Sequence, residues 1–293
     1  MFYKILIALT LIIISTACTL EGVKKKEKDT NFFESIDTTT VDPINIQKDN
    51  TIKPDTLNNG NSNELVWNGK DGLRIEWKTK QNSNKVQKGD VVLVNYNARV
   101  ARGEVYDSNT ELNKPVPLKT GIGQLIKGWE IGLLQMSAGD KGRIMIPSKL
   151  AFGETGVLGR VPQNADIIID IEIVAIIEPI ELQEGVKVYK YESVSEQKLP
   201  KKNQLITFHY FAYRTGKDAR MYTNSYEKGE PFQVKFENDN VVEGLHIGLS
   251  QIGENEKAFI EIPTKLAYGK KGLLDFVPSN TDIVFDVRVE SIK

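Results

Sequence analysis

The chain contains one motif twice, a fixed distance apart. The segment 147–153, Pro-Ser-Lys-Leu-Ala-Phe-Gly, returns at 263–269 as Pro-Thr-Lys-Leu-Ala-Tyr-Gly, which is a step of 116 positions (263 − 147). Because separate motifs share one offset, the chain holds a duplicated unit, and a unit of this length can bury its own core. We therefore expect two tandem domains rather than a solenoid. Further residues related by the same step are Gly128 and Gly244, Gly132 and Gly248, Leu133 and Leu249, Val161 and Val277, Pro162 and Pro278, Asp166 and Asp282, and Asp170 and Asp286.

The N-terminus has the pattern of an export signal. Lys4 precedes an apolar run over residues 5–14, which has the length of a signal-peptide core and is too short for a comfortable membrane span. Small residues follow, and then Cys18, the only cysteine of the chain. This pattern resembles a bacterial lipobox, in which the signal is removed before an acylated cysteine. An ordinary secretory signal with an incidental cysteine is the alternative.

These features predict the location of the chain. We expect a signal peptide over residues 1–17, lipidation at Cys18 and a disordered tether over residues 18–63, which is rich in Asn, Asp, Thr and Lys. The protein would then be a lipid-anchored membrane protein of a bacterial cell envelope. Thr19 is not the aspartate that retains some lipoproteins at the inner membrane, so the outer membrane is favoured, facing the periplasm or the cell surface.

Composition excludes several classes of function. The net charge is −1, and this balance does not suggest nucleic acid, so no nucleic-acid partner is expected. With Cys18 acylated, no thiol is left for a disulfide, a metal site or nucleophilic catalysis. We expect no metal and no cofactor.

Each half is predicted to be rich in strands, with one short helix. In the first half the strand patterns cover residues 91–96, 143–146 and 166–177, and apolar spacing predicts a helix over 126–134. The second half repeats this order, with strands over 205–210, 258–262 and 283–292 and a helix over 242–250. This is an α+β plan of antiparallel sheets. Residues 178–181 are the expected hinge, across which few apolar residues should make contact.

The first half contains a series of separated motifs: Tyr96, Tyr106-Asp107-Ser108, Gly121, Leu125 to Glu130, Met136, Leu150 to Gly153 and Val161-Pro162. In order and spacing these motifs resemble the FKBP-type peptidyl-prolyl cis-trans isomerases. The resemblance covers residues 73–177, and residues 186–293 resemble the same family more weakly. It implies two tandem domains, each an antiparallel half β-barrel wrapped around a short α-helix, with boundaries 64–178 and 179–293.

The resemblance also implies a site in the first half. Trp129 would form the floor under a proline ring, Asp107 would be the one acid inside, and the Ile126 backbone N–H would donate to a peptide carbonyl. Phe152 stands where the family usually carries a tyrosine, so one hydroxyl donor is missing. The implied catalytic residues are Asp107, Trp129, Tyr96, Tyr106 and Ile126, and the implied substrate-binding residues are Val116, Leu125, Phe152, Val161 and Ile169.

The chemistry of the family agrees with these residue types. Isomerising an Xaa-Pro bond makes and breaks no covalent bond, and its barrier of about 20 kcal/mol is the loss of amide resonance on twisting. A dry apolar pocket that prefers the twisted amide is sufficient, without nucleophile or metal. Without the resemblance, Trp129 and the two tyrosines would be read as ordinary core aromatics.

The second half differs in its site. The 116 step places Leu245 where the first half has Trp129, and Thr223 where it has Asp107. Tyr210 corresponds to Tyr96 two positions out of step, because residues 214–220 contain a two-residue insertion. We expect little or no isomerase activity there. The corresponding second-domain pocket residues are Tyr210, Tyr222, Phe232, Val241, Val242, Tyr268, Val277 and Phe285.

The function implied is a membrane-anchored peptidyl-prolyl cis-trans isomerase that assists the folding of exported proteins. Its expected partners are prolyl peptides, unfolded exported proteins, a macrolide ligand and, through the lipid anchor, the membrane. The alternative is a holdase-like or assembly lipoprotein that binds partners with little or no turnover. A purely structural lipoprotein is the third candidate.

Overall fold

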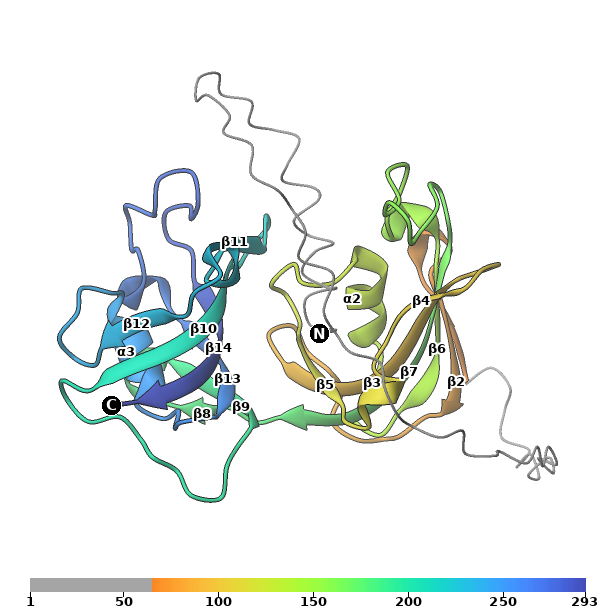
Figure 1. The fold of residues 1–293 in the computed structure, drawn as a ribbon. Helices are drawn as coiled ribbons and strands as arrows, with labels where there is room; N and C mark the ends of the chain where they lie inside the picture. The colour runs from red at the N-terminus through yellow and green to blue at the C-terminus, as the bar shows by residue number, and fades with distance from the viewer. Residues whose placement is uncertain (1–64) are drawn as a thin grey trace, which may run out of the picture.

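The computed structural model describes residues 65–293, which form two antiparallel seven-stranded sheets (Figure 1). We call β1 to β7 the N-terminal domain and β8 to β14 the C-terminal domain. The predicted signal peptide, Cys18 and the tether lie outside the described residues. Neither helix described within this range has the length and apolar character to cross a bilayer.

The N-terminal sheet has the strand order β1-β2-β6-β7-β3-β4, and β5 pairs with β3. One α-helix, α2, packs against β6. The elements are β1 (Val66–Asn68), β2 (Arg74–Thr79), β3 (Val91–Val100), β4 (Val105–Ser108), β5 (Val116–Lys119), α2 (Lys127–Leu133), β6 (Lys141–Ile146) and β7 (Ile167–Ile177), with 3-10 turns at Lys70–Gly72, Thr110–Leu112 and Ser148–Leu150.

The C-terminal sheet repeats this plan in the order β11-β10-β14-β13-β9-β8, with β12 paired to β10 and α3 packed on β13. The elements are β8 (Ile180–Glu181), β9 (Lys187–Glu192), β10 (Leu205–Arg214), β11 (Arg220–Asn224), β12 (Phe232–Lys235), α3 (Glu243–Leu249), β13 (Lys257–Ile262) and β14 (Ile283–Ile292), with 3-10 turns at Gln183–Gly185, Tyr226–Lys228 and Thr264–Leu266. The predicted α+β plan and both predicted helices are confirmed, each helix one residue shorter at either end.

Strand register confirms how the two halves correspond. Tyr96 lies opposite Ile171, and Tyr210 lies opposite Val287, which is Ile171 moved by the step of 116 positions. Tyr210 therefore occupies the place of Tyr96 although their own offset is 114 (210 − 96). The predicted two-residue insertion accounts for the difference.

Repeated glycines let each helix lie directly on its sheet. A Cβ atom at Gly128 would stand 2.2 Å from Ile146 Cγ2, and one at Gly244 would stand 2.2 Å from Ile262 Cγ2. Any larger residue would push the helix away from the strand. The close approach brings the next residue of α2, Trp129, and its counterpart Leu245 on α3 into the two cores.

The two domains are in apolar contact. A buried cluster contains Val91 and Ile122 of the N-terminal domain together with residues of the C-terminal sheet. The expectation that few apolar residues cross the hinge at 178–181 is therefore wrong, because one outer sheet face is built of aromatic side chains that need a cover. The buried C-terminal members are Tyr189, Phe211, Tyr213, Met221, Phe259 and Val284.

Candidate active site

The structure brings the implied residues of the N-terminal domain together. Nine of them belong to, or pack on, one hydrophobic cluster, and the tenth, Asp107, is hydrogen-bonded to a member of it. They come from strands β3, β4, β5 and β7, from the start of α2 and from the loop after β6. The buried ones are Tyr96, Asp107, Trp129, Val161 and Ile169, and the half-buried ones are Tyr106, Val116, Leu125, Ile126 and Phe152.

Three side chains form the centre of the site. The Tyr96 hydroxyl donates to Asp107 Oδ2 at 2.8 Å, which holds the carboxyl group against the aromatic wall. The Tyr96 and Trp129 rings meet edge to face with centroids 5.0 Å apart. Trp129 is only 3% exposed, so its indole is a rigid part of the core rather than a mobile lid.

Two buried polar atoms of this centre lack a partner among residues 65–293. They are Asp107 Oδ1, an acceptor, and Trp129 Nε1, a donor. Leaving such an atom unsatisfied costs about 1–3 kcal/mol, and native proteins rarely accept that cost without a reason. Both atoms belong to side chains that contact Tyr96, so the two unsatisfied groups lie on either side of one tyrosine ring.

Burial controls the ionisation of the site. Desolvation raises the pKa of Asp107, and the Tyr96 hydrogen bond opposes this only in part. Desolvation and the neighbouring Asp107 charge raise the pKa values of Tyr96 and Tyr106, so both remain neutral hydroxyls at physiological pH. The site is thus a largely apolar environment with one carboxyl group whose charged form is disfavoured.

The rim of the site is set by the start of α2 and by the loop after β6. Ile126 is the N-cap of α2, and its carbonyl accepts from the N–H groups of Trp129 and Glu130. N–H groups at this end of a helix have no partner within the helix, which suits the donor role implied for Ile126. On the opposite wall, Tyr106 and Phe152 meet edge to face at 5.8 Å.

A separate cavity of about 420 Å³ lies between the domains. Of the implied site residues only Tyr96 and Val116 line it, and Trp129 does not. Its other walls include Phe211 and Tyr226, whose rings stack at 4.6 Å. This cavity therefore adjoins the site at β5 without containing its floor.

The C-terminal domain keeps an aromatic wall without the floor and the acid. The Tyr210 ring lies 5.8 Å from Phe232 and 5.4 Å from Phe285, and Tyr222 meets Tyr268 at 6.4 Å. Val277 is buried in the same core, while Val241 and Val242 pack against it. All eight second-domain pocket residues implied by sequence thus gather in one place.

Strand register shows what replaces the floor and the acid. Thr223 stands opposite Ala212 as Asp107 stands opposite Ala98, so the threonine occupies the position of the acid. Leu245, 3% exposed, takes the place of Trp129 in the core.

Asn109 is not among the site residues implied by the sequence, but it organises the site. Its Oδ1 accepts the Tyr96 N–H at 2.7 Å, and its Nδ2 donates to the carbonyls of Val94 and Lys114. These bonds fix β3 against the strand that carries Asp107. Ser225, one step of 116 along the chain, accepts the Tyr210 N–H through Oγ at 2.9 Å. The shared offset was the signal that could have identified this pair.

A family model described as FKBP-type peptidyl-prolyl cis-trans isomerase matches residues 82–174 and again 196–290. The human protein named peptidyl-prolyl cis-trans isomerase FKBP9 is 30% identical over 224 residues, which are 76% of this chain and 38% of that protein. Peptidyl-prolyl cis-trans isomerase FKBP15-2 of Arabidopsis thaliana is 38% identical over 106 residues, 36% of this chain and 65% of that protein. The chain thus spans well under half of the human relative.

Among solved structures, the three FKBP domains of wheat FKBP73 align at 22% identity with a TM-score of 0.39, covering 76% of this chain and 95% of that one. FkpA from Escherichia coli aligns at 30% identity with a TM-score of 0.35, covering 39% of this chain and 51% of that one.

These relatives correct the predicted location. Proteins matching about three quarters of the chain come from human, cattle and mouse, and they are not bacterial envelope lipoproteins, so the location assigned from the N-terminal pattern is wrong. Residues 1–18 can resemble a processing signal whatever domains follow them, so this pattern alone does not fix the location of the protein. The two matched segments, by contrast, fall one in each domain and together cover more than half of the chain, and the chain belongs to the FKBP-type peptidyl-prolyl cis-trans isomerase family.

Proposed function

We propose that the chain catalyses cis-trans isomerisation of Xaa-Pro bonds, and that the N-terminal domain carries the activity. The observation that supports this most is the group formed by Tyr96, Asp107 and Trp129. It combines an aromatic floor with a buried donor and a buried acceptor, both without partners among the described residues. The C-terminal domain has neither the indole nor the acid.

The proposed mechanism needs no covalent step. A proline ring rests on Trp129 beside the wall formed by Tyr106 and Phe152, while the Ile126 N–H holds a carbonyl of the bound chain. The planar amide loses resonance as it twists, and an apolar, water-excluding pocket that fits the twisted form better than either planar form lowers that barrier. Asp107 lies where it can interact with the polarised amide of the twisted state.

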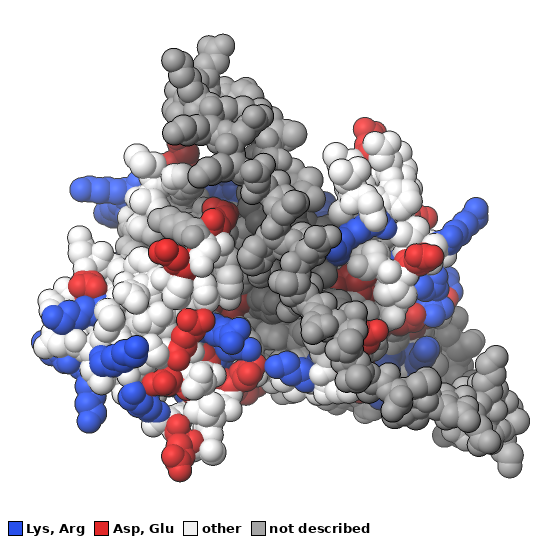
Figure 2. Space-filling view, in the orientation of Figure 1, with Lys and Arg blue, Asp and Glu red and all other residues white. Residues whose placement is uncertain are grey.

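The substrates proposed are unfolded protein chains that expose Xaa-Pro segments, and a macrolide would compete for the same apolar pocket. Figure 2 shows Lys and Arg interspersed with Asp and Glu over the visible face of the described residues. Neither domain shows a wide single-sign area on that face, which supports recognition through the apolar pocket rather than by charge.

The proposed architecture follows the family. We assign the domains to residues 64–178 and 179–293, each a half β-barrel around its helix. The contacts of Gly128 with Ile146 and of Gly244 with Ile262 support this assignment, since they place both helices directly on the sheets.

An isomerisation assay on a short Xaa-Pro peptide tests the proposal. The full chain should accelerate exchange between cis and trans forms, followed by NMR exchange spectroscopy, and a macrolide should inhibit it. Loss of the acceleration in Trp129→Leu, with an unchanged circular dichroism spectrum, supports the assignment. Full activity in that variant would contradict it.

A second candidate is holding unfolded chains with little turnover. The aromatic wall around Tyr210, Phe232 and Phe285 favours it, because Phe232 is 38% exposed and can contact an apolar client. Suppression of aggregation of a denatured protein should then survive Trp129→Leu and weaken in Phe232→Ser. If Phe232→Ser keeps full suppression, the C-terminal wall is not the holding surface.

A further inference from the structure

Strand β5 belongs both to the implied prolyl pocket and to the contact between domains. Val116, its first residue, packs on the core of the pocket. Lys119, its last residue, has a side chain that is only 1% exposed, which is rare for lysine. A four-residue strand is short enough that fixing one end restricts the other. The position of Lys119 therefore bears on the pocket.

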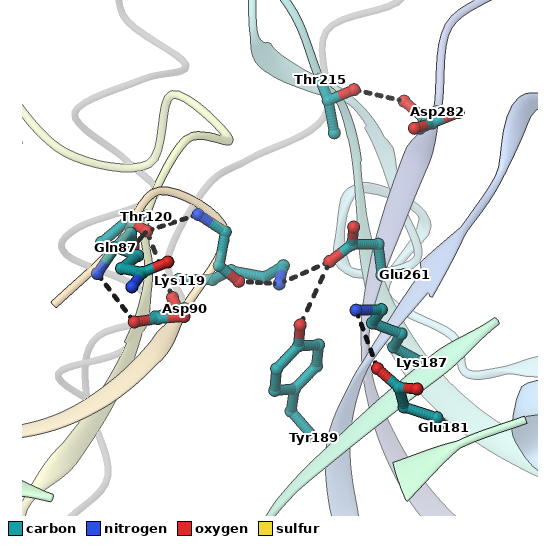
Figure 3. Close-up of polar contacts among 11 residues, drawn as sticks. Gln87, Asp90, Lys119, Thr120, Glu181, Lys187, Tyr189, Thr215, Glu261 and Asp282 are labelled. Carbon is teal, nitrogen blue, oxygen red and sulfur yellow. Dashed lines mark hydrogen bonds and ion pairs between the residues drawn. The ribbon is translucent and has the colours of Figure 1, made fainter. Parts of the chain in front are cut away.

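Lys119 reaches into the C-terminal domain (Figure 3). Its Nζ lies 3.0 Å from Glu261 Oε2 on β13 and 4.0 Å from the centre of the Tyr189 ring on β9. It also donates to the Gly89 carbonyl of its own domain at 2.5 Å. One ammonium group thus joins a carboxylate and an aromatic ring of one domain to a backbone carbonyl of the other.

A second contact fixes the segment that follows β5. Ile122, 1% exposed, lies in the apolar cluster shared by both domains. Gly123 has a φ of +71°, and a Cβ atom there would stand 2.1 Å from the carbonyl oxygen of Ala219. Only glycine allows this approach of the two backbones. The segment is therefore held at Lys119, Ile122 and Gly123.

The same segment leads directly into the pocket rim at Leu125 and Ile126. The Lys119 N–H donates to Gln124 Oε1 at 3.3 Å, and the Gly121 N–H donates to Glu130 Oε1 on α2. Moving β5 would therefore move the start of α2.

The attraction between Lys119 and Glu261 does not outweigh the free-energy cost of burying the lysine. Desolvation lowers the pKa of Lys119, and the opposing effect of Glu261 does not cancel this, so the charged form is disfavoured. Replacing such a buried pair by apolar groups is often neutral or stabilising. A residue that adds little stability but sets a register has a positioning role.

We propose that the C-terminal domain positions the prolyl pocket of the N-terminal domain, and that Lys119 and Glu261 are the positioning residues. This inference rests on the proposed function. The C-terminal domain acts through Lys119, β5 and the segment to Ile126, and it sets the distance between the Val116 wall and the Ile126 rim without touching the substrate.

The test compares two lysines that bridge the same domains in the full chain. Lys119→Met removes the buried contact, and Lys114→Met removes the exposed pair with Glu192, where Lys114 is 60% exposed. We expect kcat/KM for a prolyl peptide to fall about fivefold in Lys119→Met. This is the low end of the range of effects that one site of a protein has on another. The amide signals of Val116 and Ile126 should shift in the peptide-free protein, with an unchanged circular dichroism spectrum. Lys114→Met should change none of these.

Glu261→Gln is the second variant: because Glu261 is 30% exposed and glutamine keeps its shape, we expect the variant to fold. Equal amide shifts and equal activity in Lys119→Met, Glu261→Gln and Lys114→Met would overturn the proposal. The shifts need no catalysis, so an inactive wild-type chain would refute the proposed function alone, and shifts confined to the Lys119 and Glu261 variants would still support positioning.

Discussion

The two domains share their fold but differ on both faces of the sheet. On the inner face, the N-terminal domain has Trp129 and Asp107 where the C-terminal domain has Leu245 and Thr223. On the outer face, Arg143 pairs across the sheet with Glu76 and Asp170, while its counterpart Phe259 stands between Tyr189 and Asp286. One copy is thus specialised at its pocket and the other at its contact with the neighbouring domain.

The outer faces show why a duplicated fold need not give two equivalent domains. Arg143 is partly exposed and bonds Asp170 at 2.8 Å, as suits a strand facing water. Phe259 is fully buried by the contact between domains. An aromatic face without its cover would expose a large apolar area, so this face of the C-terminal sheet depends on the N-terminal domain to cover it.

The largest expected effect tests this difference of the outer faces. Phe259→Ala should lower the free energy of unfolding by about 3–5 kcal/mol, because it leaves a cavity in the contact between the domains. Arg143→Ala at the equivalent position should cost about 1 kcal/mol or less, since it removes only a partly exposed ion pair. Urea denaturation of both variants measures this. Equal losses would mean that the outer faces are equivalent after all.

The next effect concerns the floors of the two pockets. Trp129→Leu gives the N-terminal domain the residue of its counterpart, and kcat/KM should fall about 30-fold, the equivalent of about 2 kcal/mol of lost contact with the twisted state. Leu245→Met, a matched change of the other floor, should leave turnover within about twofold, because volume-conserving core changes are tolerated. A loss in Leu245→Met as large as that in Trp129→Leu would place activity in both domains.

Asp107→Asn tests the acid that only one domain has. We expect about a tenfold lower kcat/KM, the loss of one charge-assisted interaction worth about 1.5 kcal/mol. Assays at neutral pH with equal concentrations of each protein measure the change in kcat/KM. Thr223→Val, in the other pocket, is the control and should have no effect on turnover.

The same variant has a defined pH dependence of stability. Because burial raises the pKa of Asp107 above its ordinary 3.8, the folded state binds the proton more tightly than the unfolded state. Wild-type stability should therefore fall, relative to Asp107→Asn, as pH rises from about that value through the raised pKa. Denaturation curves of the two proteins at several pH values should diverge in this direction, and the opposite divergence would mean that the carboxylate is stabilised in the fold.

The smallest expected effect comes from exchanging the ring at one position of each pocket, Phe152 in the N-terminal domain and Tyr268 in the C-terminal domain. Phe152→Tyr supplies the hydroxyl that the N-terminal pocket lacks, and it should tighten binding of a prolyl peptide about threefold, a fraction of one hydrogen bond. Tyr268→Phe, the reverse change, should leave binding at the N-terminal pocket unaltered. Titrations followed by NMR distinguish the two, and weaker binding in Phe152→Tyr would show that the pocket has no room for the added hydroxyl.

Much of this organisation could be read from the sequence. The repeated motifs indicated two domains, and the strand pattern over residues 166–177 is confirmed by β7, in which alternate residues from Ile167 to Ile173 are buried. The family resemblance implied that Tyr96, Asp107 and Trp129 share one site, and in the structure Tyr96 contacts both of the others.

Only the tertiary structure decided how the two copies meet. A period of two along a strand separates its faces but does not say what covers the outer one. Lys119 and Glu261 are 142 positions apart, and neither carries a local signal of its partner. Sequence therefore determined the duplication and the strand-rich plan of each half, since these follow from local pattern and repeated spacing, while the pocket residues came from the family resemblance. The buried lysine and the aromatic contact arise from packing through space, which no single segment encodes.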